Sequence, residues 1–334
     1  MALIHAIYRY PVKGLSPERL ARIPLTPGET VPGDRLYAIE NGPSGFDPER
    51  RPYLAKQHFL MLMRNERLAR LRTAFDQASH TLTITDPSPP GSRLRAPECR
   101  LLWGGVGVGV ARRRANVDAL TSPHDPPPGS PSRKRDGVTP HPPPQGGRDI
   151  SGDLRTADGR AAIERYFAAF CADELRGPPK ILHAPGHSFS DVARKVVSII
   201  NLASVAAIEA MVDAPVDPLR FRGNVYAEGW PAWSELDLVG KELKINPLPL
   251  AGEGPGHPVA QARRGPRGGG APVRLKVVKR IVRCAATNVD PLTGIRDLNI
   301  PKALLRALGH ADCGVYAEVI EGGEIAEGDA VETV

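Results

Sequence analysis

Proline is concentrated in two parts of this chain, and the clustering limits what can fold more than any other feature. Residues 87–148 hold thirteen of the 35 prolines, in runs such as PHDPPPGSPSRKRDG and TPHPPPQGG. Proline lacks a backbone N–H and fixes its own φ, so such a run supports neither a helix nor a central strand. A second stretch, residues 247–272, reads PLPLAGEGPGHPVAQARRGPRGGGAP. We predict that both are long, disordered, Pro/Gly-rich insertions.

The positive charge of the chain lies in the same two stretches. The formal net charge is +7, and residues 87–148 hold ten Lys/Arg against four Asp/Glu while residues 247–272 hold three against one. A nucleic-acid groove needs its cations on a folded face. We therefore rank a basic RNA- or DNA-binding protein last and expect no nucleic-acid partner. The GGVGVGV run in the first stretch does not match the phosphate-binding GxGxxG pattern.

Outside these stretches the sequence is typical of a globular protein. Residues 1–86 contain the short strand patterns LIHAIYRYPV, RLYAIEN and TLTIT. The segment FLMLMRNERLARLRTAF has apolar residues three and four apart, which predicts a helix. We expect a small mixed β domain over residues 1–86.

The second half alternates helices with many short strands. RAAIERYFAAFCADEL predicts a helix, and VVSIINLASVAAIEAMV predicts a strand followed by a helix that is capped near Asn201–Ser204. RFRGNVYAEG, LDLVGKELKI, VRLKVVKRIVRC, GVYAEVIEG and DAVETV predict strands. LDLVGKELKI and VRLKVVKRI both alternate, so we expect them to pair across the second insertion. Residues 149–334 should form a β-barrel domain with flanking helices, interrupted at 247–272, which makes the whole chain mostly β with α (α+β).

A set of motifs in a fixed order resembles the MOSC family. The motifs are YRYPVKGL, VPGDRLYAIENG, FSDVARKVVSIINLASV, LRFRGNVYAEGWPAWSELDLVG, RCAATNVDPLTG and GGEIAEGDAV. The family includes the C-terminal domain of molybdenum-cofactor sulfurases and the amidoxime-reducing proteins, and its longer members carry an N-terminal β-barrel domain before MOSC. The resemblance spans nearly everything except the two Pro/Gly-rich stretches.

The resemblance implies a molybdenum-pterin cofactor and a set of residues that hold it. Cys284 of RCAATNVDPLTG would bind the metal through its thiolate, a soft ligand that suits molybdenum. A buried, inert cysteine is the alternative. Cations and amides would hold the anionic cofactor. By resemblance these residues are Lys13, Arg35, Arg222, Asn224, Arg283, Thr287 and Asn201.

Two positions depart from the family pattern. Gly223 precedes Asn224 where the family usually has proline, and Gly14 follows Lys13 where serine is common. Gly223 gives the backbone more freedom than proline would. Gly14 removes one hydroxyl donor. Neither change removes a charged contact.

The family suggests two functions for such a site. In the first, the protein is an oxidoreductase that reduces small N-hydroxylated compounds and takes electrons from an external iron–sulfur or haem protein, because its own cysteines are not spaced for a [2Fe–2S] centre. In the second, it is a non-redox carrier or sulfurase-type module in which Cys284 holds the cofactor or a persulfide. Pyridoxal phosphate enters only through distant family association, and no residues here support it.

The remaining motifs give weaker support for a specific function. His183 and His187 have the HxxxH separation, but Pro185 and Gly186 between them prevent a helical zinc pair. That loop is expected to border the substrate pocket instead, with polar lining from Ser188, Ser190 and Asp191. The chain has four widely spaced cysteines, no signal-peptide pattern and no run of about 20 apolar residues, so we expect a cytoplasmic protein without a membrane partner.

Overall fold

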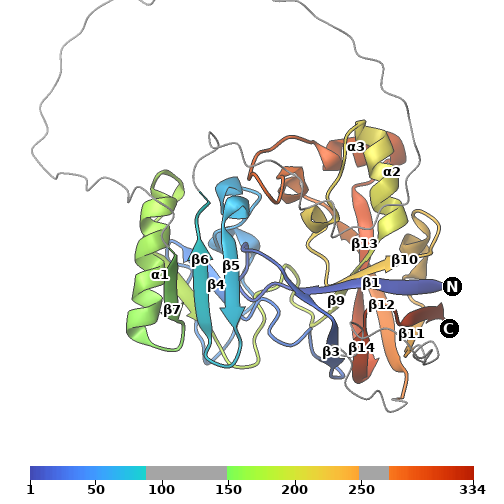
Figure 1. Ribbon diagram of the computed structural model, residues 1–334, viewed down its shortest axis with the longest axis horizontal. Helices are drawn as coiled ribbons and strands as arrows, with labels where there is room; N and C mark the ends of the chain where they lie inside the picture. Colours follow the sequence, from blue (N-terminus) through green and yellow to red (C-terminus); the bar gives the residue numbers. More distant parts are fainter. Residues whose placement is uncertain (88–148, 248–270) are drawn as a thin grey trace, which may run out of the picture. The chain divides into compact units, whose positions relative to one another are not determined.

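The computed structural model describes residues 1–87, 149–247 and 271–334. Both predicted insertions, residues 87–148 and 247–272, fall almost wholly outside the described residues. The described chain combines strands with three α-helices and several short 3₁₀ helices, which confirms the predicted α+β class (Figure 1). The 3₁₀ helices are η1 (Lys56–His58), η2 (Glu66–Arg70), η4 (Ala172–Glu174), η5 (Pro218–Phe221), η6 (Ser234–Leu238) and η8 (Ala285–Asn288).

Seven strands of the described chain pair in a closed ring and form a barrel. In order around the ring they are β1 (Ala2–Arg9), β10 (Val225–Glu228), β9 (Val197–Asn201), β13 (Asp312–Glu321), β12 (Val273–Val282), β11 (Glu242–Asn246) and β15 (Ala330–Thr333), which returns to β1. β9 and β10 are parallel, and the other neighbours are antiparallel. β2 (Glu18–Leu20) pairs with the last three residues of β1, from Ile7 to Arg9. Because β1 closes the ring, the N-terminal segment is part of the barrel.

Alternation of side chains explains why these strands enclose a core. On β12, Val273, Leu275 and Val277 are buried while the intervening lysine and arginine side chains face outward. This period of two puts every second residue on the inner face. β11 pairs antiparallel with β12, with Leu243 opposite Leu275, so the predicted pairing across the second insertion is confirmed.

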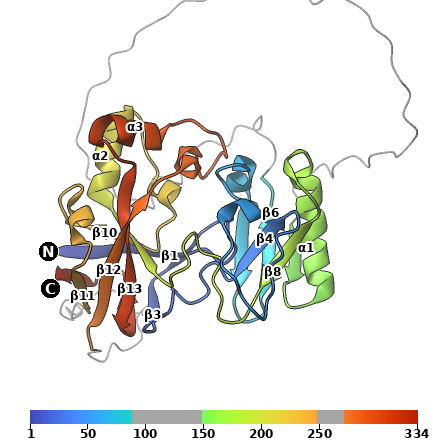
Figure 2. The same ribbon diagram turned by 180° about the vertical axis from the view of Figure 1, so that it is seen from behind.

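A second group of strands carries its own core. β4 (Tyr37–Asn41) pairs with β8 (Pro179–His183), and β5 (Arg72–Asp76), β6 (Thr81–Thr85) and β7 (Ile150–Asp153) form a three-stranded sheet. Helix α1 (Ala157–Phe170) lies beside β7 in both views (Figures 1 and 2). These pairings cross the domain boundary that we placed at residue 149, and the predicted boundaries remain predictions. β3 (Arg22–Leu25) pairs with β14 (Gly323–Ala326).

Two further helices lie together beside the barrel (Figures 1 and 2). α2 (Leu202–Val212) follows β9 directly, and the Asn201 side chain accepts a hydrogen bond of 3.1 Å from the Ala203 N–H. This is the predicted strand-to-helix junction with its cap. α3 (Ile300–Leu308) begins after Asn299 and ends at Gly309, which has a φ of 76°. No helix in the described ranges is long and apolar enough to cross a membrane.

The helix predicted for FLMLMRNERLARLRTAF is wrong. The segment forms a turn, the short η2 and then β5. The Asn65 side chain accepts from the Met61 N–H at 3.1 Å, and Arg296 donates to the carbonyls of Leu62 and Met63. In an α-helix the two carbonyls would accept from backbone N–H groups four residues later, so the contacts of Arg296 take the place of helical bonds. The last residues instead pair with β6, so tertiary pairing outweighs the apolar spacing.

Candidate functional site

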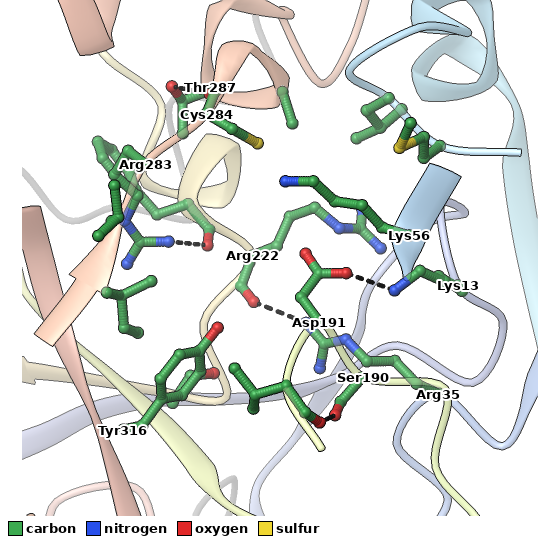
Figure 3. Close-up of a pocket in the computed structure, with 18 of the residues that line it drawn as sticks. Lys13, Arg35, Lys56, Ser190, Asp191, Arg222, Arg283, Cys284, Thr287 and Tyr316 are labelled. Atoms are coloured by element: carbon green, nitrogen blue, oxygen red, sulfur yellow. Dashed lines mark hydrogen bonds and ion pairs between the residues drawn. The ribbon is translucent and has the colours of Figure 1, made fainter. Parts of the chain in front are cut away.

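A cavity of about 240 Å³ lies where the end of β12 meets the loops of both strand groups (Figure 3). Among the described residues its lining is strongly cationic, with two carboxylates, Asp34 and Asp191. The basic lining residues are Lys13, Arg35, Lys56, Arg220, Arg222, Lys279, Arg280 and Arg283. Cations gathered around a concave, low-dielectric surface focus a positive potential on whatever enters. The cavity is therefore suited to an anionic ligand.

Cys284 stands at this cavity immediately after β12. It is partly exposed, whereas Cys171 and Cys313 are buried. The backbone N–H and the hydroxyl of Thr287 both donate to the Cys284 carbonyl at 3.0 Å. These two bonds fix the first turn of η8 and with it the position of the thiol. Thr287 thus supports Cys284 through its backbone.

Lys56, which sequence reasoning missed, faces Cys284. Figure 3 shows its nitrogen pointing toward the Cys284 sulfur. Burial alone would lower the pKa of Lys56, but its interactions with Cys284 and with Asp191 raise the pKa above the ordinary value. Lys56 is therefore a cation at neutral pH. No motif surrounds it in the sequence, and its place is set by the fold of the loop after β4.

Lys13 is held by the loop that the sequence predicted to border a pocket. Its ammonium donates to the Phe189 carbonyl at 2.8 Å and forms an ion pair with Asp191. Burial lowers the pKa of Lys13, and Asp191 offsets this only in part. Burial alone would raise the pKa of Asp191, but Lys13 and Arg35 lower it to about 2. The loop prediction holds for Ser190 and Asp191, which line the cavity, whereas Ser188 donates to the Asp34 carbonyl beside it.

Arg35 and Arg222 stack on the same aromatic ring. Their guanidinium carbons lie 4.9 Å and 4.2 Å from the centre of the Tyr10 ring. Both have a φ of 51°, which is uncommon for residues with a side chain. Arg35 pairs with Asp34 and donates to the Arg222 carbonyl at 3.1 Å. The buried Nη2 of Arg222 has no hydrogen-bond partner within the described part of the chain. A buried donor left without a partner is costly, so it marks a place for an acceptor.

Arg283 and Asn224 line the cavity, but their polar groups form hydrogen bonds with other residues of the protein. The Arg283 guanidinium donates to the carbonyls of Cys313 at 2.7 Å and Phe221 at 2.9 Å. The Asn224 side chain accepts from the N–H and hydroxyl of Ser198 and donates to the Tyr8 carbonyl at 3.2 Å. Both residues therefore act on the site by fixing the strands around it.

Comparison with known proteins gives the family. The model of the MOSC domain matches residues 184–332, and the model of the MOSC N-terminal beta barrel domain matches residues 1–100. The chain is a MOSC domain-containing protein. No curated protein matches its sequence.

Two solved structures resemble this MOSC protein distantly. The YuaD protein from Bacillus subtilis is 12% identical, with 100% of this chain and 96% of that chain covered and a TM-score of 0.36. YiiM from Geobacillus stearothermophilus is 16% identical, with 41% of this chain and 53% of that chain covered and a TM-score of 0.27.

MOSC domains are associated with molybdenum-cofactor binding. The residues at this cavity fit such a group by the chemistry of their donors. A thiol supplies a soft ligand, and Lys56 together with the unpartnered Nη2 of Arg222 supplies cationic donors for an anion. Among the described residues no cluster of three or more His, Cys, Asp or Glu could hold a free metal ion. His183 and His187 are part of aromatic contacts, His183 stacked on Tyr37 at 4.8 Å.

Asn201 does not line the cavity of the MOSC protein, although the resemblance assigned it to the cofactor. It is fully buried, and its amide donates to the Pro231 carbonyl at 2.8 Å and to Glu235 at 2.9 Å. Ser204 donates to the same Glu235 carboxylate at 2.9 Å. The side chain is used in capping α2 and in satisfying a buried carboxylate, so no polar group remains for a ligand.

Arg220 anchors the loop that follows η8. Its guanidinium, 1% exposed, forms two bonds to Asp297 at 2.8 Å and 2.7 Å and one to Asp290 at 3.2 Å. Asp290 also accepts from the N–H groups of Leu292 and Thr293, which forms a tight turn before Gly294. Arg220 therefore ties the turn that follows η8 to η5.

Proposed function

We propose that the cavity binds a molybdenum-pterin cofactor with Cys284 as the protein ligand to the metal, and that the protein is an oxidoreductase that reduces N-hydroxylated compounds. The observation that carries the proposal is the arrangement of one partly exposed thiol with Lys56 and the unpartnered Arg222 donor at one cationic cavity in a MOSC protein. An anionic, thiolate-ligated cofactor matches each of these groups.

The roles of the chain's own residues follow from their contacts. Lys56 and the unpartnered Nη2 of Arg222 would supply cationic donors for the anionic parts of the cofactor, and Lys13 and Arg35, each paired with an aspartate, would hold the wall behind them. Thr287, Arg283 and Asn224 keep the cavity wall in place through backbone and strand contacts. Met61, Leu62 and Met63 add an apolar part to the lining of the cavity.

The bound cofactor would supply the electron transfer that removes oxygen from the substrate. The overall reduction takes two electrons and two protons and releases the oxygen as water. We propose an external iron–sulfur or haem protein as the electron donor, and a cytoplasmic location, where a ligand thiol stays reduced.

Turnover tests this proposal directly. Purified protein from a host that makes the cofactor is mixed with a small N-hydroxylated amidine and an artificial one-electron donor, and the amidine product is measured. The proposal expects product in proportion to bound molybdenum. Bound cofactor without turnover of any N-hydroxylated compound would contradict the redox role and favour the carrier role.

A further inference from the structure

The cations of the cavity divide into those neutralised by carboxylates and those that are not. Lys13 pairs with Asp191 and Arg35 pairs with Asp34. Arg220 and Arg280 pair with aspartates outside the cavity. Within the described residues, four lining cations form no ion pair with a carboxylate: Lys56, Arg222, Lys279 and Arg283. Of these four, Lys56 points its nitrogen toward the Cys284 sulfur, whereas the guanidinium of Arg222 points away from it (Figure 3).

Lys56 differs from Arg222 in what it lies against. Arg222 is packed on Tyr10 at 4.2 Å and its backbone carbonyl is bound by Arg35, so it belongs to the deep wall of the cavity. Lys56 comes from the short η1 and reaches the thiol from the opposite side, beside Met61 and Met63. Its cation therefore faces the space in front of Cys284, where a reacting molecule has to approach.

We propose that Lys56 makes the thiol end of this cavity selective for anionic molecules, so that the substrates are N-hydroxylated compounds that also carry a carboxylate or another oxyanion. The assignment of substrates rests on the proposed function, while the selectivity for anions concerns the cavity alone. A fixed ammonium in a concave site raises the local concentration of anions and lowers that of cations. Lys56 is thus a specificity-determining residue.

The charge preference at the thiol can be measured without any cofactor. Iodoacetate and iodoacetamide alkylate the same thiolate and differ in charge, so the ratio of their rates does not depend on the thiolate fraction. Alkylation of the Cys284 peptide is followed by mass spectrometry in cofactor-free wild type, Lys56→Gln, Lys56→Arg and Lys56→Glu. Lys279→Gln, which removes a more exposed cation of the same cavity, is the matched control.

The expected result is a ratio of iodoacetate to iodoacetamide rates that falls at least about fivefold in Lys56→Gln, which is the effect of one unit charge about 4 Å away even at the dielectric constant of water. Lys56→Arg should restore the ratio and Lys56→Glu should lower it further. Lys279→Gln should change it less. A ratio that is the same in wild type and Lys56→Gln overturns the proposal, whatever the cofactor content of the protein.

Turnover then tests the substrate class. Two aromatic amidoximes that differ only by a para carboxylate are compared in cofactor-loaded wild type and Lys56→Gln. We expect the carboxylate to lower KM in wild type and to lose this advantage in the variant. If the alkylation ratio responds to Lys56 but neither compound turns over, the proposed reaction fails and the anion selectivity stands. A carboxylate that leaves KM unchanged in wild type refutes the substrate assignment.

Discussion

Replacement of Arg220 by methionine should destabilise the protein strongly, because it removes the partner of two carboxylates. The guanidinium is 1% exposed and makes three charge-assisted hydrogen bonds, two to Asp297 and one to Asp290. Such bonds contribute about 1.5–3 kcal/mol each before compensation. Asp290 and Asp297 are 23% and 42% exposed, so water replaces part of what is lost. We expect a cost of about 3 kcal/mol, at the low end for breaking a buried pair.

Urea unfolding followed by circular dichroism measures this cost. For a domain of this size the same change lowers Tm by roughly 6–12 °C. Arg22→Met is the matched control, because Arg22 pairs with Glu324 at 3.2 Å on the surface and should contribute less than about 1 kcal/mol. Adding Asp290→Asn and Asp297→Asn to Arg220→Met should recover part of the loss, since the uncompensated charges are gone. A loss below about 1 kcal/mol for Arg220→Met would refute the reasoning.

Three further predictions follow from single contacts. The pKa of Asp191 is about 2 in the folded protein and about 4 when unfolded, so its pair with Lys13 stabilises the fold above pH 4, and this stabilisation is lost as the pH falls toward 2. Urea unfolding between pH 5 and pH 2 should therefore show a smaller pH dependence of stability for Asp191→Asn than for wild type, and the same pH dependence in both proteins would contradict this. A Cβ at Gly223 would lie 2.3 Å from Cγ1 of Ile200, so Gly223→Ala should lower the stability of the protein by about 1–3 kcal/mol. A thermal melt measures this, and an unchanged Tm would show that the Ile200 side chain moves aside without cost. Asn201→Ala should lower the stability of the protein by about 2–4 kcal/mol, while the amount of molybdenum per folded protein stays at the wild-type value. Loss of molybdenum from the folded variant would show instead that Asn201 contributes to cofactor binding.

The sequence predicted those parts of the fold in which local pattern and tertiary packing agree. The junction at Asn201 combines an apolar strand with a capping residue, and both features are local. The pairing of β11 with β12 follows from two alternating strands on either side of the second insertion. The helix predicted for residues 59–75 failed because Arg296, far outside the segment, binds two carbonyls that a helix would pair, and because the last residues of the segment pair with β6.

The candidate site was predictable in part for the same reason. Cys284 and Arg222 lie in motifs that identify them, and both line the cavity. Lys56 has no motif, because its position depends on the loop that carries η1 toward the barrel. For Arg283, the sequence indicated its neighbourhood but not the carbonyls that engage its guanidinium. The motifs therefore indicate which residues lie near the cavity more readily than which groups their side chains bind.

The central claim is that Cys284 binds molybdenum, and metal content measures it most directly. Wild type and Cys284→Ser are purified from a host that makes the cofactor and are analysed for molybdenum by elemental mass spectrometry and for pterin by fluorescence after oxidation. Cys171→Ser, which changes a buried cysteine outside the cavity lining, is the control. We predict near-stoichiometric molybdenum and pterin in wild type and in Cys171→Ser, and loss of molybdenum in Cys284→Ser. Wild type without molybdenum and pterin, or Cys284→Ser with the wild-type content of molybdenum, would contradict the account.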